Sequence, residues 1–317
     1  MAETNKHEVI IVGAGPAALS AAIYTTREDI DTLLFDRGAP GGLAAITDWV
    51  DNYPGFPDGI AGLELAEKLQ KQAERFGAAI EFGEVLKIHD SGKYKRLETT
   101  SGDYTARAIL IATGSDYKKI GVPGEAEYYA RGVHYCATCD GAFYRDKKLV
   151  VVGGGNSAVQ ETMFLTKFAS HIDLLVRSTI KASEVLQKDL QKYIDSGKVT
   201  VHLGTSTEEI VGNSEGKVSE VVGKKDGKTV KLPTDGVFVF VGLKPNSEFL
   251  EGSGIELDHL HLVKSDENLQ TSMPGVFVAG DIHSGATMQI ASAVGEGATA
   301  ALKIREYLEG HAHPIQN

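Results

Sequence analysis

The sequence is poor in several features, and each shortage excludes a class of protein. It contains only two cysteines in 317 residues, so it is not a domain held together by many disulfides. No apolar run approaches the ~20 residues of a membrane span, and the polar start, Met1 to His7, lacks the apolar core of a signal peptide. Acidic residues outnumber basic ones by 43 to 32, which argues against general binding to nucleic acid or anionic membranes. We therefore expect a cytoplasmic protein of about two domains, at roughly 100–200 residues per domain.

Glycine is abundant instead, with 36 residues, and a glycine loop marks the start of each of two similar units. The first unit begins with the apolar stretch 7–12, which is typical of a buried strand. A loop with the pattern Gly13-x-Gly15-x-x-Ala18 follows, and then small residues that predict a helix. Asp36 ends the next predicted strand, so the segment is typical of a β–α–β unit.

The spacing in this first loop predicts a dinucleotide site. The glycines let the backbone approach a pyrophosphate, the helix N-terminus offers amide donors, and an acidic residue about 20 positions later holds a ribose. Gly13, Gly15 and Ala18 are therefore candidates for the pyrophosphate, and Asp36 is the candidate for the ribose. The alternative is a plain tight turn between a strand and a helix.

The same pattern restarts in the middle of the chain. The stretch 148–152 predicts a strand, and the glycine loop 153–155 precedes a second predicted helix. The next predicted strand ends at Arg177, without an acidic residue, and Lys181 follows shortly. A cation at this place is typical of sites for the 2′-phosphate of NADP. We therefore predict nucleotide binding here, with NADPH as one option, the alternative being that Arg177 is an ordinary surface residue.

The remaining apolar stretches complete an α/β pattern. Predicted strands lie at 108–112, 172–176, 237–241 and 276–279, and predicted helices lie at 65–76 and 290–308. Two segments that contain both glycine and proline, 117–125 and 242–249, are the expected joints between the domains.

Both cysteines lie in one Cys-x-x-Cys motif, Cys136 and Cys139. Such a pair can form a small reversible disulfide, and a helix N-terminus would favour its thiolate. Asp140 follows directly and could deliver or hold a proton during thiol–disulfide exchange. A zinc site would need about four ligands, and only His134 and Asp140 lie nearby. A structural disulfide and two inert thiols are further alternatives, and His134 is either a base or an ordinary packed side chain. We favour redox chemistry and expect no metal site.

Two dinucleotide units and a Cys-x-x-Cys pair together indicate electron transfer from a reductant, through a flavin, to a disulfide. At these motifs the chain resembles the low-molecular-weight thioredoxin reductases, which are FAD proteins with two nucleotide-binding domains, and the resemblance covers nearly the whole length. The segments that carry it are GAGPAALSAA (13–22), NYPGFP (52–57), ATG (112–114), RGVHYCATCDGAFYR (131–145), GGGNSA (153–158) and AGD (279–281).

The resemblance implies an α/β fold of two Rossmann-like nucleotide-binding domains, with the second inserted into the first. Residues 1–117 and 246–317 would form the FAD-binding domain, and residues 118–245 would form the inserted domain that carries the Cys-x-x-Cys motif. Thioredoxin or a similar protein would be the partner, and the family is usually a homodimer.

The resemblance also assigns roles to single residues. Cys136 and Cys139 would be the redox pair, Asp140 would be the proton donor, and Arg131 and Phe143 would help to dock thioredoxin. The candidates for FAD are Gly13, Gly15, Ala18, Asp36, Gly42, Asn52, Thr113, Gly114, Asp281 and Gln289. The candidates for the second nucleotide are Gly153, Gly155, Ser157, Arg177 and Lys181.

The chain departs from the family where the electron donor and the flavin edge would lie. Leu43 stands where the family commonly has Gln, and Met288 stands where it commonly has Arg. Arg177-Ser178 stands where members that use NADPH carry a His-Arg-Arg run. We therefore expect NADPH to be at best a poor donor and leave the donor open between NADPH and others such as ferredoxin. Two alternatives are a flavoenzyme like the ferredoxin–NADP reductases, which lack the Cys-x-x-Cys pair, and a non-enzymatic redox sensor, which would need an output domain.

Overall fold

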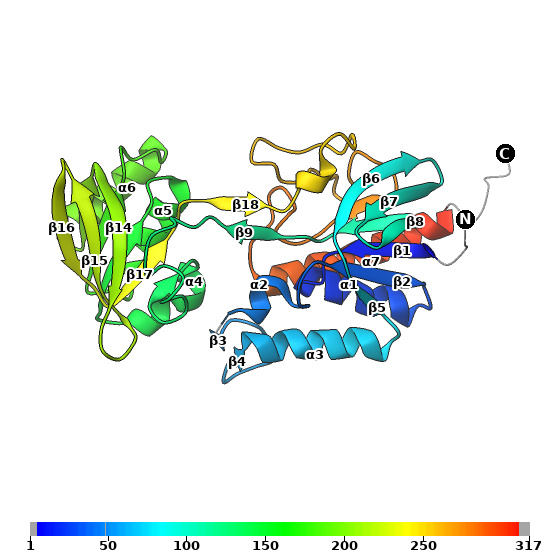
Figure 1. Ribbon diagram of the computed structural model, residues 1–317, viewed down its shortest axis with the longest axis horizontal. Helices are drawn as coiled ribbons and strands as arrows, with labels where there is room; N and C mark the ends of the chain where they lie inside the picture. Colours follow the sequence, from blue (N-terminus) through cyan, green and yellow to red (C-terminus); the bar gives the residue numbers. More distant parts are fainter. Residues whose placement is uncertain (1–4, 48, 311–317) are drawn as a thin grey trace. The chain divides into compact units, whose positions relative to one another are not determined.

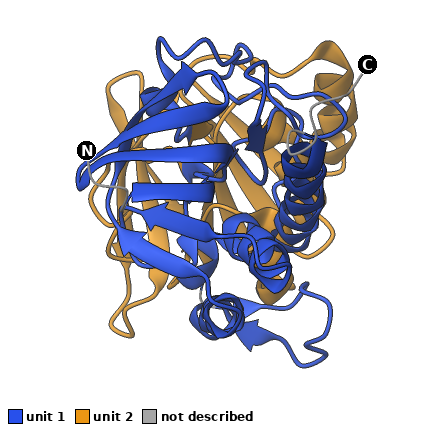
Figure 2. Ribbon diagram, turned by 90° about the vertical axis from the view of Figure 1, so that its right-hand side faces the viewer, with its two compact units in different colours: residues 1–116, 245–317 blue, residues 117–244 orange. Residues whose placement is uncertain are grey.

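The computed structural model describes residues 5–47 and 49–310. Residues 1–4 of the polar start lie outside this range. The chain divides into two compact units, here called unit 1 (Met1–Asp116 with Pro245–Asn317) and unit 2 (Tyr117–Lys244). Figure 2 colours them separately and shows that unit 1 contains both ends of the chain.

Unit 1 is built on a mixed sheet with the strand order β5-β2-β1-β8-β7-β6, and a seventh strand, β19, pairs with β8. The central strands are parallel, whereas β6, β7 and β8 pair in antiparallel fashion. The strands are β1 (Lys6–Val12), β2 (Thr32–Asp36), β5 (Ala79–Phe82), β6 (Val85–Ser91), β7 (Tyr94–Thr99), β8 (Gly102–Ile111) and β19 (Val276–Val278). β1 is buried from Val9 to Val12, as expected of a parallel strand that is covered on both faces.

Helices cover one face of this sheet (Figure 1). They are α1 (Pro16–Arg27), α3 (Gly62–Arg75) and α7 (Ile290–Gly310), with a short α2 (Gly42–Ala45) beside them. α7 packs closely on α1, since a Cβ on Gly297 would lie 2.1 Å from the carbonyl oxygen of Ala17. The other face is covered by apolar residues between Phe249 and Ile282, and side chains of β6 and β7 belong to the same core. The first of these residues lie in η3 (Glu248–Leu250). The strands β3 (Trp49–Val50) and β4 (Ile60–Ala61) form a small separate ribbon.

Unit 2 contains a parallel five-stranded sheet with the order β10-β17-β11-β12-β13. Its strands are β10 (Val133–His134), β11 (Lys148–Val152), β12 (His171–Val176), β13 (Val199–Leu203) and β17 (Gly236–Val239). One face packs against α5 (Asn156–Leu165) and α6 (Glu184–Asp195). The other packs against an antiparallel sheet of β14 (Thr205–Gly212), β15 (Val218–Lys225) and β16 (Lys228–Pro233). The helix α4 (Ala137–Asp140) and the 3-10 helix η2 (Gly141–Tyr144) follow β10.

The two connections between the units pair with each other as the strands β9 (Ser115–Tyr117) and β18 (Leu243–Pro245). On the first connection Glu125 is buried, and its carboxylate accepts hydrogen bonds from the amides of Ile120 and Gly121 and from the hydroxyl of Tyr135, at 2.7–2.9 Å. The Glu125 carboxylate therefore links the backbone at Ile120 and Gly121 to Tyr135 of unit 2.

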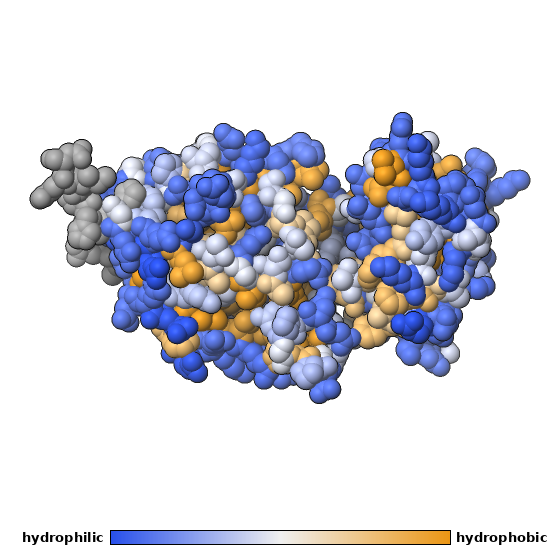
Figure 3. All heavy atoms as spheres, turned by 180° about the vertical axis from the view of Figure 1, so that it is seen from behind, coloured by the Kyte–Doolittle hydropathy of each residue, from blue (hydrophilic) through white to orange (hydrophobic). Residues whose placement is uncertain are grey.

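The expected α/β fold with two Rossmann-like units is confirmed. The strand expected at 108–112 is the end of the longer β8, and the antiparallel sheet of unit 2 was not predicted. Hydrophilic residues cover most of the face shown in Figure 3, in keeping with the charge of the chain. No helix within the described ranges, 5–47 and 49–310, is both long and apolar enough to cross a membrane.

Candidate active site

The first glycine loop lies between β1 and α1, where the sequence places it. Gly13 has a φ of 107°, and a Cβ there would lie 2.4 Å from the carbonyl oxygen of Ala112, so the loop requires glycine. Gly15 is the N-cap of α1 and has open space where a side chain would lie. Ala18 is buried in the first turn of α1. The result is an open cradle at a helix N-terminus, which suits a phosphate group.

The carboxylate of Asp36 is held beside this cradle at the end of β2. Its Oδ2 accepts a hydrogen bond from the amide of Ala14 at 2.6 Å, and its Oδ1 accepts one from Gly38 at 2.8 Å. These bonds order the glycine loop and fix the acid at the position that holds a ribose in dinucleotide folds.

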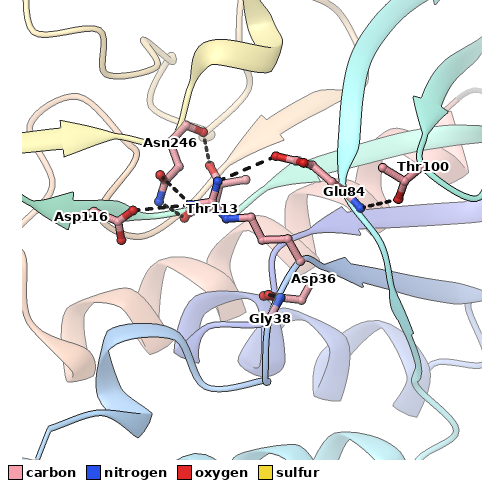
Figure 4. Close-up of polar contacts among 8 residues, drawn as sticks. Asp36, Gly38, Glu84, Thr100, Thr113, Asp116 and Asn246 are labelled. Atoms are coloured by element: carbon pink, nitrogen blue, oxygen red, sulfur yellow. Dashed lines mark hydrogen bonds and ion pairs between the residues drawn. The ribbon is translucent and has the colours of Figure 1, made fainter.

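Sequence reasoning missed a polar cluster that begins at the next residue, Arg37. Its Nη2 donates to Asn246 Oδ1 at 3.2 Å and to Asp116 Oδ2 at 3.4 Å, and its Nη1 lies 3.8 Å from Glu84 Oε1 (Figure 4). Asn246 donates in turn to the carbonyl oxygen of Thr113 at 3.0 Å and accepts from the Thr113 hydroxyl at 2.8 Å. Thr113, a predicted FAD residue, is therefore held by Asn246, which carries no sequence signal of its own.

Two further pairs of predicted residues are brought together in unit 1. Gly42 approaches the first loop, since a Cβ on it would lie 3.5 Å from the Cα of Gly15. Asn52 donates through its amide to Gln289 Oε1 at 3.0 Å, although the two residues are 237 positions apart. Gly114 has a φ of 64° and open space at its Cβ position.

Asp281, three residues after the end of β19, is a half-buried carboxyl without a hydrogen-bond donor among the described residues. Burial, and secondarily the charge of Glu296, raises its pKa to about 6. Glu296 accepts from the amide of Gly280 at 2.8 Å, and its Oε2 lies 3.4 Å from His283 Nδ1. A carboxyl in this state is suited to the hydroxyl groups of a bound ligand, which would restore the hydrogen bonds that burial removed.

The residues of unit 1 fit an extended dinucleotide such as FAD. The open helix N-terminus at Gly15 suits its pyrophosphate, the fixed carboxylate of Asp36 suits a ribose, and the Asp281 carboxyl suits further hydroxyls. These are three different chemical requirements of one ligand, and they are met by segments that are far apart in the sequence.

The second glycine loop has the same construction in unit 2. Gly153 has a φ of 149°, and a Cβ there would lie 2.3 Å from the carbonyl oxygen of Phe240. Gly155 is the N-cap of α5 with open space beside it, and Ser157 is exposed in the first turn. The amide of Lys181 donates to the Gly154 carbonyl at 2.6 Å. Lys181 is therefore held beside the loop.

Arg177 follows β12 directly, and both its side chain and that of Lys181 are exposed. The structure thus places both predicted cations on the segment that borders the second glycine loop.

The two cysteines are joined in a disulfide at the start of α4. Cys136 is the N-cap of this helix, and its Sγ accepts a hydrogen bond from the amide of Cys139 at 3.2 Å. Asp140 is the last residue of α4 and is partly buried. The predicted redox pair and proton donor therefore lie on one helical turn.

The other predicted residues of unit 2 lie on either side of this turn. Phe143, in η2, is 54% exposed, a large fraction for an aromatic side chain. Arg131 is exposed, and its Nη2 donates to the carbonyl oxygen of Glu127 at 2.5 Å. His134 is not an isolated histidine, because its ring contacts both Asp140 and Tyr144.

Comparisons with known proteins show which family the chain is similar to. The family described as pyridine nucleotide-disulphide oxidoreductase matches residues 7–297. The thioredoxin reductase of Bacillus subtilis is 42% identical over 312 residues, which cover 98% of this chain and 97% of that protein. The thioredoxin reductase of Listeria monocytogenes is 41% identical, with 97% of this chain and 95% of that protein covered.

Solved structures give the same result. The crystal structure of thioredoxin reductase from Streptococcus pyogenes matches with a TM-score of 0.91 at 38% identity, covering 96% of this chain and 99% of that one. Thioredoxin reductase from Giardia duodenalis matches with a TM-score of 0.90 at 32% identity and the same coverage.

Proposed function

From the premise that this chain belongs to the low-molecular-weight thioredoxin reductases, an FAD-dependent family of disulfide oxidoreductases, we propose that it reduces thioredoxin or a similar protein disulfide. The observation that carries the proposal is the disulfide between its only two cysteines, at the start of α4 and directly before Asp140. The reduced cysteine pair then passes two electrons to the disulfide of the target.

Bound FAD supplies a two-electron carrier between the donor and the Cys136–Cys139 disulfide. Gly13 and Gly15 would bring the backbone amides of α1 to its pyrophosphate, and Asp36 would hold the ribose of its adenosine. Asp281 would serve the ribityl or phosphate part. The residues that would line the rest of the cofactor are Ala18, Gly42, Asn52, Thr113, Gly114 and Gln289.

Thiol–disulfide exchange completes the reaction. One thiolate of the reduced pair attacks a sulfur of the target disulfide, so a mixed disulfide forms as the target S–S bond breaks. The leaving thiolate of the target takes a proton, for which Asp140 is the donor. The second cysteine then passes its proton to Asp140 and attacks the mixed disulfide, so the Cys136–Cys139 bond forms again as the mixed disulfide breaks, and Asp140 returns the proton to the second thiolate of the target. Each cycle delivers two electrons and two protons to the target.

The surface near the redox pair provides the docking site for the target. Phe143 offers exposed apolar area close to α4 in sequence, and Arg131 offers a positive charge. An exposed aromatic residue and an arginine are typical anchors of a protein interface. We also expect the chain to form the homodimer that is usual in the family, which sedimentation of the purified protein measures.

For the electron donor, we propose that NADPH works poorly and that another donor, such as reduced ferredoxin, serves the enzyme. The second glycine loop is intact and offers the N-terminus of α5 to a pyrophosphate. The cations for a 2′-phosphate are limited to Arg177 and Lys181, with Ser178 beside them. Each missing charge-assisted contact costs about 1.5–3 kcal/mol, or roughly tenfold to a hundredfold in affinity.

Anaerobic mixing tests both parts of the proposal. The purified protein is mixed in turn with NADPH, NADH and reduced ferredoxin while the flavin absorbance is followed, with dithionite as the control for full reduction. We expect rapid bleaching with ferredoxin and little with NADPH, followed by reduction of oxidised thioredoxin. Rapid reduction by NADPH would contradict the donor assignment alone. Failure to reduce any protein disulfide after the flavin is bleached would contradict the function itself.

A further inference from the structure

His134 is a buried histidine that the exchange reaction described above does not use. It is the last residue of β10, two positions before Cys136, and only 9% of it is exposed. Its ring stacks on Phe238 with centroids 5.1 Å apart and meets the Tyr144 ring edge-on at 5.3 Å. The imidazole is therefore fixed by aromatic packing before any polar contact is considered.

Both ring nitrogens of His134 face a polar partner. Nε2 is hydrogen-bonded to the Tyr144 hydroxyl at 2.7 Å, and Nδ1 lies 3.2 Å from Asp140 Oδ2. A row of three side chains, Tyr144, His134 and Asp140, therefore leads from the interior of unit 2 to the turn that carries the cysteines.

The neighbouring polar atoms decide which nitrogen of His134 carries the proton. A lone pair on Nδ1 would face the lone pairs of Asp140 Oδ2, whether or not the other oxygen, Oδ1, carries a proton, so this contact favours the tautomer with its proton on Nδ1. Nε2 then accepts from the Tyr144 hydroxyl. Burial, with the charges of Asp140 and Asp235, raises the pKa of Tyr144, which therefore keeps the proton that it donates. This tautomer follows from the contacts, since hydrogen positions are assigned from them.

The other titratable groups around His134 leave this pattern unchanged. Cys139 lies on α4 and Cys136 is the N-cap of this helix, Asp235 precedes β17, and Tyr129 is joined to Val133 by a β-bridge. Burial and the charge of Asp140 raise the pKa of Tyr129, which is therefore also a neutral hydroxyl.

We propose that His134 is a positioning residue for Asp140, which it holds through Nδ1 in the orientation for proton donation during thiol–disulfide exchange. The contact occupies Oδ2 and leaves Oδ1 for the sulfur chemistry. When the proton has passed to the leaving thiolate, the Nδ1 proton faces the carboxylate that remains. The proposal rests on the function proposed above, in which Asp140 is the proton donor.

The test measures the exchange step alone. The FAD-containing protein is reduced with dithiothreitol, freed of excess reductant and mixed with oxidised thioredoxin in a stopped-flow instrument. The variant His134→Gln reaches toward Tyr144 but not toward Asp140, whereas His134→Asn places an amide where Nδ1 lies. We expect about a tenfold to hundredfold slower exchange in His134→Gln, partial recovery in His134→Asn, and no change in FAD content or flavin bleaching by dithionite.

A matched control is available in the same unit. His202 Nε2 lies 2.7 Å from Asp173 Oδ1, in a histidine–aspartate pair on β13 and β12. His202→Gln breaks a comparable contact without touching the helix α4, and it should exchange at the parent rate.

A double-mutant cycle shows whether His134 acts through Asp140. In the Asp140→Asn background, His134→Gln should add less than about threefold, because the group that His134 orients is already disabled. An equal loss in both backgrounds, or a parent rate in His134→Gln, would overturn the proposal. If His134→Gln loses FAD or unfolds, Tyr144→Phe replaces it in the cycle, with a smaller loss expected in the same direction.

The two proposals fail differently. If the reduced parent protein does not react with thioredoxin, the target assignment fails, and the cycle is measured with bis(2-hydroxyethyl) disulfide, whose weakly acidic leaving thiol needs a proton. A loss caused by His134→Gln when Asp140 is present, but not in the Asp140→Asn variant, still supports the role of His134, and full additivity still refutes it.

Discussion

Replacing Asp281 with asparagine should stabilise the FAD-free protein at neutral pH. Burial and the charge of Glu296 raise the pKa of this carboxyl from its ordinary 3.8 to about 6. The folded protein therefore binds a proton at pH values where the unfolded chain has released it. Stability falls as the pH rises between about 4 and 6, and the full penalty is present above pH 6. The difference of about two pH units corresponds to about 3 kcal/mol.

The assay is urea unfolding of the FAD-stripped protein at several pH values. Trp49 is the only tryptophan and lies in unit 1 with Asp281, so its fluorescence reports on the relevant unit. Asp281→Asn should gain up to about 3 kcal/mol at pH 8, and roughly half of this should remain at pH 5. Glu267→Gln, which changes an exposed acid of the same unit, should have no such pH-dependent effect.

The outcome that refutes this reasoning is equally clear. An equal effect of Asp281→Asn at pH 5 and pH 8, or a loss of stability at pH 8, would show that other groups of the folded protein compensate the Asp281 carboxylate for its burial. The argument that this carboxyl requires the hydroxyl groups of a ligand would then lose its basis.

Four further variants test the site and the core. Cys136→Ser and Cys139→Ser should each abolish reduction of thioredoxin while the flavin still accepts electrons, and full turnover in either would show that the pair is not the electron relay. Asp36→Ala should weaken FAD binding about tenfold to a hundredfold, because a charge-assisted hydrogen bond is lost. Fluorescence titration of the FAD-stripped protein with FAD measures this affinity. An unchanged affinity would contradict the assignment of Asp36 to the ribose. Gly297→Ala should destabilise unit 1 by about 1–3 kcal/mol, because its methyl group would overlap the backbone of α1, and an unchanged urea midpoint would argue against this close helix contact.

Features set by a few neighbouring residues could be predicted from the sequence. The loop at Gly13 and the acid at Asp36 belong to one short unit whose spacing follows from dinucleotide geometry. The Cys-x-x-Cys pair is equally local, and its disulfide needs no distant residue. Strands such as β1 and β11 can be predicted because parallel strands are buried on both faces and therefore form continuous apolar runs in the sequence.

Features that depend on tertiary packing could not be predicted. The bonds from Arg37 to Asn246 and from Asn52 to Gln289 join residues more than 200 positions apart. β14 was not predicted because its sequence, TSTEEIVG, is mostly polar and most of its side chains lie outside the core. The contact of His134 with Asp140 spans only six residues, yet it depends on how α4 turns after β10, which the pattern does not define.

The composition of unit 1 from both ends of the chain has a consequence during protein synthesis. β19 completes the pairing of β8, and α7 covers α1. β8 and α1 therefore lack these partners until the last segments of the chain have been made. At 5–20 residues per second, the 160 residues from 117 to 276 take roughly 8–32 s to emerge. Unit 2 is continuous and can fold on the ribosome in that interval. During that time the apolar face of α1 and the edge of β8 that β19 will cover are exposed to other chains.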